Sequence, residues 1–158
     1  MDYFAHGLWS YIFFNKTKKP WLAVIFGLLP DTFSWFIYMI YRFFNGPEFG
    51  KPNLQMIPEW MNFLYGITHS LIIALLFFVI VYFITKKVYY FLLAWPIHIL
   101  IDIPTHSREF LPTPFLWPLS NWYFPGISWG TKWFMITNWS LIIISLCAII
   151  YYKRKKQF

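Results

Sequence analysis

All four histidines of this sequence lie in or beside strongly apolar stretches, together with two of its aspartates. His98 and Asp102 are four residues apart, so a helix would place both side chains on the same face. This spacing suits two ligands of one metal ion, or one ligand and the carboxylate that orients it. Within a membrane-spanning helix, each ionisable group costs about 2.5–3.5 kcal/mol on insertion scales, which makes such groups candidates for function. The candidate metal ligands are His6, Asp31, His69, His98 and Asp102.

The apolar stretches that carry these residues predict an integral membrane protein. Apolar residues make up 59% of the 158 residues and charged residues only 12%, about half the charged fraction of a soluble domain. A spanning helix needs about 20 mostly apolar residues. We therefore expect an all-α, polytopic membrane helix bundle with four transmembrane helices, at residues 20–44, 58–85, 88–103 (ending before Pro104) and 132–152. Residues 3–14 are too short to cross unaided and predict a short N-terminal re-entrant or half-membrane helix, or else an amphipathic helix on the membrane surface.

The predicted helices place the candidate ligands at similar depths in the membrane. Counted at 1.5 Å per residue from the cytoplasmic end, Asp31 lies roughly 17 Å, His98 roughly 15 Å and His69 roughly 24 Å into its helix. By the same count His6 and Asp102 lie roughly 15 and 21 Å deep. Side chains from four helices thus fall in one layer between the mid-bilayer and the outer leaflet, so we expect them to meet. The alternative is a metal-free network of hydrogen bonds among the same side chains.

The chemistry of these ligands limits the choice of metal. Histidine and carboxylate without a thiolate suit zinc, manganese or iron(II). Five candidate ligands exceed the three that a catalytic zinc ion usually takes from its protein, so we expect divalent metal, zinc first, as one ion or as a pair about 3.5–4 Å apart. A cation would also neutralise carboxylates at a depth where the sequence offers no other positive charge, because Arg42 and Arg108 both fall nearer the outer surface.

The positive charges of the chain, whose net charge is +7, predict its orientation. Alternate threading of the helices puts the basic clusters on one side, which the positive-inside rule makes cytoplasmic, and the acidic residues outside the spans on the other. We therefore expect a protein of the cytoplasmic membrane with a cytoplasmic C-terminus and a site toward the outer face. Its expected partners are membrane lipids and not nucleic acid. The basic residues are Lys16, Lys18, Lys19, Lys86, Lys87, Lys153, Arg154, Lys155 and Lys156, and the acidic ones are Asp2, Glu48, Glu59 and Glu109.

Residues 1–158 form one predicted membrane-embedded domain. Residues 110–130 connect the third and fourth predicted spans and contain repeated prolines, which forbid a regular helix, as well as Trp and Tyr, which suit the headgroup level. We expect this segment to fold over the helices at the outer interface as a cap. It would serve either as an aromatic anchor or as a lid that handles substrate.

Several short motifs, taken in their order along the chain, resemble a known family. They are Leu28-Leu29-Pro30-Asp31, Gly66-Ile67-Thr68-His69-Ser70 and the stretch from His98 to His106, with His6 before them and Leu116-Trp117-Pro118 after them. Over residues 1–120 this order is similar to that of the LexA-regulated, membrane-bound, metal-dependent hydrolases. More distantly, the ligand order resembles that of zinc-dependent phospholipases C, which would imply phosphoester hydrolysis.

One position departs from the family pattern. Members often carry His-Arg before the glycine of the second motif, where this chain has Leu64-Tyr65. If that arginine binds an anionic group of the substrate, this chain uses another residue, such as Arg108, or a different substrate.

The resemblance implies a membrane-embedded metal-dependent hydrolase that acts on a phosphoester of a lipid or lipid-linked molecule at the outer membrane face. The residues expected to carry the reaction, beside the metal ligands, are Asp31 as the base for water, His106 with Thr105 as proton donor to the leaving group, and Arg108 as the group that holds a phosphate oxygen.

A transporter for metal ions or protons is the competing interpretation, because it too would bury histidines and aspartates. Against transport, the last predicted span has no ionisable residue, and residues 71–84 are almost wholly apolar. A third interpretation is a scaffold that a metal stabilises without chemistry.

Overall fold

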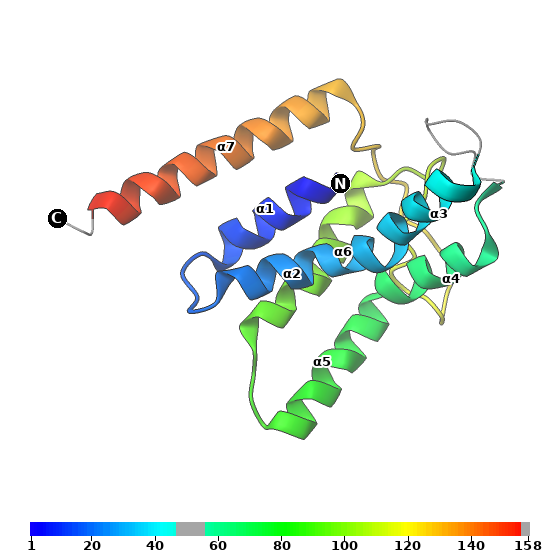
Figure 1. Cartoon of the computed structure of the whole chain (residues 1–158), viewed down its shortest axis with the longest axis horizontal. Helices are drawn as coiled ribbons and strands as arrows, with labels where there is room; N and C mark the ends of the chain where they lie inside the picture. Colours follow the sequence, from blue (N-terminus) through cyan, green and yellow to red (C-terminus); the bar gives the residue numbers. More distant parts are fainter. Residues whose placement is uncertain (47–55, 156–158) are drawn as a thin grey trace.

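The computed structural model describes residues 1–46 and 56–155, and all regular secondary structure in these ranges is helical (Figure 1). Glu48 and Lys156, which contribute to the predicted charge asymmetry, lie outside the described residues. The elements in chain order are α1 (Tyr3–Phe14), α2 (Pro20–Asp31), the π-helical segment η1 (Thr32–Phe36), α3 (Ile37–Asn45), α4 (Glu59–Thr68), α5 (Leu71–Thr85), the 3₁₀ segment η3 (Tyr90–Leu93), α6 (Ala94–Thr105) and α7 (Lys132–Lys155).

Two helical stretches are long and apolar enough to cross a membrane. They are Pro20–Asn45, which contains α2, η1 and α3 over 26 residues, and Lys132–Lys155, which is α7 with 24 residues. The pair α4 and α5 meets the same criterion only as one broken span, because the two helices bend by 54° at their junction. Only 11% of the apolar window of α7 is buried inside the molecule, so this helix presents its apolar surface outward, as lipid contact requires.

The third predicted span, at residues 88–103, is shorter in the structure than a crossing helix. Its counterpart, Tyr90–Thr105, is one of the shorter apolar helices. Two or three stretches of the described chain are long enough to cross a membrane, so the expected number of four stays a prediction. The predicted end before Pro104 is wrong, since α6 continues through Thr105. A proline in the last turn removes a single helical hydrogen bond, and the His106 N–H still donates to the Asp102 carbonyl at 3.0 Å.

Helices α1 and α2 lie side by side and are joined by a short loop (Figure 1). Their close approach depends on a glycine. A Cβ atom at Gly27 would lie 1.9 Å from the Ser10 hydroxyl oxygen and 2.8 Å from the Ser10 Cβ, which is closer than any real packing contact. Ala5 on α1 and Ala23 on α2 are also completely buried. Small residues therefore bring the backbone of α1, and with it His6, close to that of α2.

The helical path changes at Asp31, the last residue of α2. Pro30 has no N–H, and the chain widens directly afterwards into the π-helical segment η1. Side-chain hydroxyls donate to carbonyls around this change: Ser34 to Pro30 and Thr32 to Leu28, both at 2.7 Å. These bonds satisfy backbone groups that would otherwise be costly in an apolar environment.

A second irregularity separates α4 from α5. The Ser70 hydroxyl caps α5 by accepting from the Ile73 N–H at 3.2 Å, and it also donates to the Trp117 carbonyl. The chain from 107 to 131 packs onto this break and onto the end of α6. Its contacts include the Phe115 carbonyl with the Leu71 N–H at 3.0 Å, and the Trp129 N–H with the Thr105 carbonyl at 2.9 Å.

In Figure 1 the loop between α1 and α2 and the C-terminal end of α7 lie on the left, and the loop after α5 lies at the bottom; all three are away from α3 and α4. The basic clusters of the sequence lie in these three regions. Which side of a membrane they face stays a prediction.

Replacement of Gly27 by alanine should destabilise the protein by about 1–3 kcal/mol, because the added methyl group must displace Ser10 or separate α1 from α2. Thermal unfolding of the purified protein in detergent measures the effect. Gly130→Ala is the matched control, since a Cβ atom there would meet nothing nearer than the Ser128 hydroxyl oxygen at 3.7 Å. Equal unfolding temperatures for the two variants would contradict the proposed close contact of α1 with α2.

Candidate metal centre

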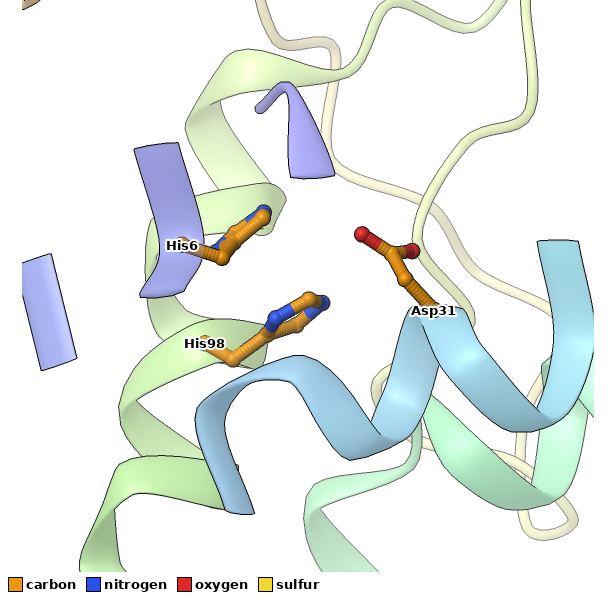
Figure 2. A group of neighbouring side chains, drawn as sticks. All are labelled: His6, Asp31 and His98. Carbon is orange, nitrogen blue, oxygen red and sulfur yellow. The ribbon is translucent and has the colours of Figure 1, made fainter. Parts of the chain in front are cut away.

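Four segments of the fold bring the five predicted ligands together. His6 comes from α1, Asp31 from the end of α2, His69 from the break between α4 and α5, and His98 and Asp102 from one face of α6. Figure 2 shows the rings of His6 and His98 beside each other, with the Asp31 carboxylate facing them across the site. The four residues other than Asp31 are almost completely buried, and the Asp31 side chain is 14% exposed.

The spacing of His69, His98 and Asp102 fits a single metal ion. His98 Nε2 lies 3.3 Å from His69 Nε2 and 3.2 Å from Asp102 Oδ2, and His69 Nε2 lies 3.6 Å from the same oxygen. Two ligands at about 2.0–2.1 Å from a tetrahedral zinc ion are themselves about 3.3–3.4 Å apart. Asp31 Oδ1, which is 3.4 Å from His69 Nε2, lies at the same spacing. His69, His98 and Asp102 therefore have the separations of ligands around one centre, and Asp31 lies beside them.

A second group of ligand atoms overlaps the first. His6, Asp31 and His98 offer ligand atoms within 4.8 Å of one another, and the rings of His6 and His98 stack with centroids 3.6 Å apart. His6 Nε2 also lies 2.9 Å from Asp102 Oδ1, the carboxylate oxygen not used in the first group. His6 Nδ1 is buried without a hydrogen-bond partner among the described residues. Since one imidazole nitrogen binds one ion, His98 Nε2 serves one group at a time.

Hydrogen bonds on the far side of the rings fix which nitrogen of His98 and His69 faces the site. His98 Nδ1 is 2.7 Å from the Gly27 carbonyl, which can only accept, so Nδ1 carries the proton. His69 Nδ1 is 3.0 Å from the Thr68 hydroxyl oxygen, and that hydroxyl donates its own proton to the Leu64 carbonyl at 2.9 Å. His69 Nδ1 is therefore also the donor. Both Nε2 atoms point a lone pair into the site.

These lone pairs face other acceptors. The two Nε2 atoms are 3.3 Å apart, and each lies within 3.6 Å of the same oxygen of Asp102. Acceptors that face one another at such distances repel unless a cation lies among them. Asp102 is nearly inaccessible to solvent, so water does not screen this repulsion. The arrangement therefore calls for a positive charge at the centre, and orientation of imidazoles by carbonyl or hydroxyl oxygens is typical of metal-binding histidines.

The predicted catalytic residues lie at different distances from this centre. His106 belongs to it: Nε2 is 3.5 Å from Asp102 Oδ1, and Nδ1 donates to the Leu111 carbonyl at 2.8 Å. The Thr105 hydroxyl lies beside it but donates to the Ile101 carbonyl at 2.9 Å. Arg108 is exposed, and its guanidinium donates to the Tyr123 carbonyl at 3.0 Å. Its role in binding phosphate stays a prediction.

Three groups at the centre carried no signal in the sequence. The main-chain nitrogen of Met1 donates to Asp102 Oδ1 and lies 3.1 Å from His106 Nε2. The Gly27 carbonyl orients His98, and the ring of Tyr65 lies 4.0 Å from that of His69 between centroids. The two backbone groups have no residue-type signature, and the position of the Tyr65 ring beside His69 depends on the fold, so only the folded chain reveals all three.

A small pocket leads to one side of the centre. Its volume is about 140 Å³, and its walls include Asp31, Tyr65 and His106 as well as Met1 and Asp2. The partial exposure of Asp31 is consistent with this position. The remaining ligands stay enclosed by the helices, so a molecule in the pocket meets the centre from the side of Asp31 and His106.

Comparison with models of protein families, with curated proteins and with solved structures gave no match. The chain is therefore not assigned to a family, and its function must be argued from the geometry of the site and the motifs of the sequence.

We expect the purified protein to bind at least one divalent ion per chain and to lose it to a chelator. Zinc at 100 times its dissociation constant should stabilise the fold by about 2.7 kcal/mol. Elemental analysis and thermal unfolding in detergent, before and after chelation, measure both effects. His98→Ala should abolish binding, whereas Glu59→Gln, at an exposed position on α4, should not change it. Failure of zinc, manganese and iron(II) alike to bind or stabilise would favour the metal-free network.

Replacement of Thr68 by valine should weaken metal binding by about 10–100-fold, because His69 loses the oxygen that holds its ring and its tautomer. Competition with a chromophoric chelator measures the affinity. Thr85→Val is the control: Thr85 makes the same bond to a carbonyl four residues earlier, at 2.8 Å, but lies at the far end of α5. If the two variants bind the metal equally, Thr68 does not orient a ligand.

Proposed function

We propose that this chain is a membrane-embedded, metal-dependent hydrolase that acts on a phosphoester of a lipid or lipid-linked substrate. The observation that carries the proposal is the set of ligand atoms of His69, His98 and Asp102, which lie 3.2–3.6 Å from one another in a buried site. The motif order shared with the LexA-regulated, membrane-bound hydrolases supports the same conclusion independently of the distances.

The ligands suit zinc as the resident ion. They are nitrogen and oxygen atoms, and the only cysteine of the sequence, Cys147, is exposed on α7. A catalytic zinc ion takes three protein ligands and keeps a position open, whereas a structural one is closed by four, commonly with thiolates. His69, His98 and Asp102 would supply the three, and Asp31 lies beside them in the wall of the pocket. A divalent cation held there would act as a Lewis acid on a phosphoryl oxygen and would activate water.

Asp31 and His106 are the groups of the chain that would move protons. Both line the pocket, so both can reach a bound phosphoester. Asp31 would accept a proton from the attacking water while the water oxygen forms a bond to phosphorus. His106 would hold a proton at Nε2 and deliver it to the leaving alcohol oxygen as the ester bond breaks. The Leu111 carbonyl fixes the ring of His106 in the orientation this requires.

A lipid substrate follows from the surroundings of the site. The helices around it present large apolar residues outward, for example Leu75 and Ile84 on α5 and Ile144 on α7. A membrane lipid can keep its acyl chains in the bilayer beside these helices while its headgroup ester reaches the pocket. The predicted orientation places the pocket at the outer face of the cytoplasmic membrane.

Transport of metal ions or protons is less well supported. A carrier needs polar groups along a path through the molecule. Helix α5 leads from His69 toward the other end of the protein and has the sequence LIIALLFFVIVYFIT. Its side chains with a polar group are Tyr82 and Thr85, both in the last turn. The site is therefore better suited to chemistry at one membrane face.

The protein in liposomes of mixed phospholipids should release a phosphorylated or free headgroup, and chelation should stop the release. Asp31→Asn should lower the rate by about 10²–10⁴-fold, the usual contribution of a general base. Mass spectrometry of both reaction products measures the rate. Glu59→Gln should retain full activity. Zinc or proton flux across the vesicle wall that depends on His98, without hydrolysis of any phosphoester, would instead favour the transporter.

A further inference from the structure

A large apolar groove lies between α1, α2 and α7. Its volume is about 540 Å³, within the range of about 300–1,000 Å³ typical of ligand pockets. The residues that line it, all in helices that the structure describes, include no charged side chain. Within each helix they recur at helical spacing, so each helix contributes one face. The wall includes Leu8 and Tyr11 from α1, Trp21 and Val24 from α2, and Trp139 and Leu146 from α7.

Helix α7 leaves this groove open because it contacts the rest of the protein along a narrow strip. Of the 24 residues of α7, all of them described, Asn138 and Ile142 are the buried ones. Asn138 accepts from the Trp9 indole N–H at 2.9 Å, which ties α7 to α1. Figure 1 shows α1 between α7 and α2. The helices at the groove therefore meet the surrounding membrane, which supplies acyl chains to fill it.

One end of the groove carries positive charge. The Lys153 ammonium group donates to the Tyr11 hydroxyl at 3.1 Å and lies 5.5 Å from the centre of the Tyr11 ring. That ring lies 5.4 Å between centroids from the ring of Trp21, which follows the loop between α1 and α2. The loop contains lysines and no acidic residue. Its lysines are Lys16, Lys18 and Lys19, and all three are exposed.

Positive charge beside an apolar groove matches an anionic phospholipid. Basic sites between membrane helices bind anionic headgroups, and Trp and Tyr suit the headgroup level. An ammonium group has three protons, so Lys153 can bind Tyr11 and a phosphate oxygen together. A zwitterionic lipid could fill the groove equally well but has no net charge for the lysines to attract. A second copy of this chain in the same orientation would bring its own basic cluster to this end and be repelled.

We propose that this groove binds an anionic phospholipid, with an acyl chain between α2 and α7 and the phosphate beside Lys153 and the loop lysines. The lining of α1 from Phe4 to Tyr11 extends over roughly 10 Å, within the roughly 15 Å of one leaflet. Lys16 is roughly 15 Å along the chain of α1 from His6, so this headgroup lies away from the metal centre. The lipid is bound as a structural partner, and the proposal does not depend on hydrolysis.

Native mass spectrometry of the full chain in detergent, with dioleoyl phosphatidylglycerol or dioleoyl phosphatidylcholine added, compares the two lipid classes. Phosphatidylglycerol should bind more tightly by at least 5-fold. Lys153→Gln should weaken its binding by about 5-fold, the effect of one basic residue at the headgroup, and leave phosphatidylcholine unaffected. Lys132→Gln removes the same charge at the exposed opposite end of α7 and should change neither affinity. Equal affinities for the two lipids, or equal losses in the two variants, would overturn the proposal.

A second variant tests the groove without changing any charge. Val24→Phe places a ring in the space of the acyl chain and should weaken phosphatidylglycerol binding by about 10-fold, with thermal unfolding in lipid-free detergent unchanged. Val79→Phe is the control, because Val79 is exposed on α5 away from the groove. Undiminished binding to a folded Val24→Phe protein would overturn the proposal. So would a lipid-free dimer, seen by size-exclusion chromatography, that Val24→Phe converts to a monomer, since a second copy would then occupy the groove.

Discussion

The burial of the Asp102 carboxylate among histidine rings is the constraint on which the rest of this structure depends. Asp102 is nearly inaccessible, and the groups around it are the ring nitrogens of His6, His69, His98 and His106 and the main-chain nitrogen of Met1. Away from water, the desolvation of a carboxylate costs several kcal/mol unless positive charge compensates it. Imidazole rings held with their lone pairs inward add to this demand. The Met1 nitrogen donates to one oxygen of Asp102, and a cation at the centre would satisfy the other oxygen together with the imidazole lone pairs.

Two of the five candidate ligands lie where the helices are irregular. Asp31 stands where α2 gives way to the π-helical segment, and His69 stands at the break before α5. Regular helices would direct these side chains along the helix faces, whereas a widened turn and a 54° bend aim them at α6. Non-helical backbone at membrane depth is tolerated only where the protein buries it and satisfies its polar groups. The hydroxyls of Thr32, Ser34 and Ser70 do so here.

The site has an enclosed part and an accessible part, and the two differ in chemistry. His69, His98 and Asp102 are shut in by helices and held by the oxygen atoms behind their rings, which suits the rigid binding of an ion. Asp31 and His106 border the pocket, so a bound molecule meets the centre from their side. Hydrolysis, unlike transport, needs access from one side only.

Much of the candidate site was accessible from the sequence because a membrane makes polar residues conspicuous. In soluble proteins a histidine four residues before an aspartate means little, but in an apolar helix its cost marks it as functional. That reasoning identified His6, Asp31, His69, His98 and Asp102, and helix lengths placed them in one layer. It overestimated regularity: the span predicted at 58–85 is broken at His69, and the helix predicted to end before Pro104 continues to Thr105.

The sequence by itself determined the helical class, the apolar exterior and the residues that meet in the buried cluster, because composition and the cost of burying charge depend on residue type alone. Only the tertiary structure decided which nitrogen of His69 and of His98 faces the centre, and that the Met1 nitrogen and the Gly27 carbonyl take part. These features arise from contacts between segments far apart in the chain. Backbone atoms and ring orientations leave no pattern in the order of residues.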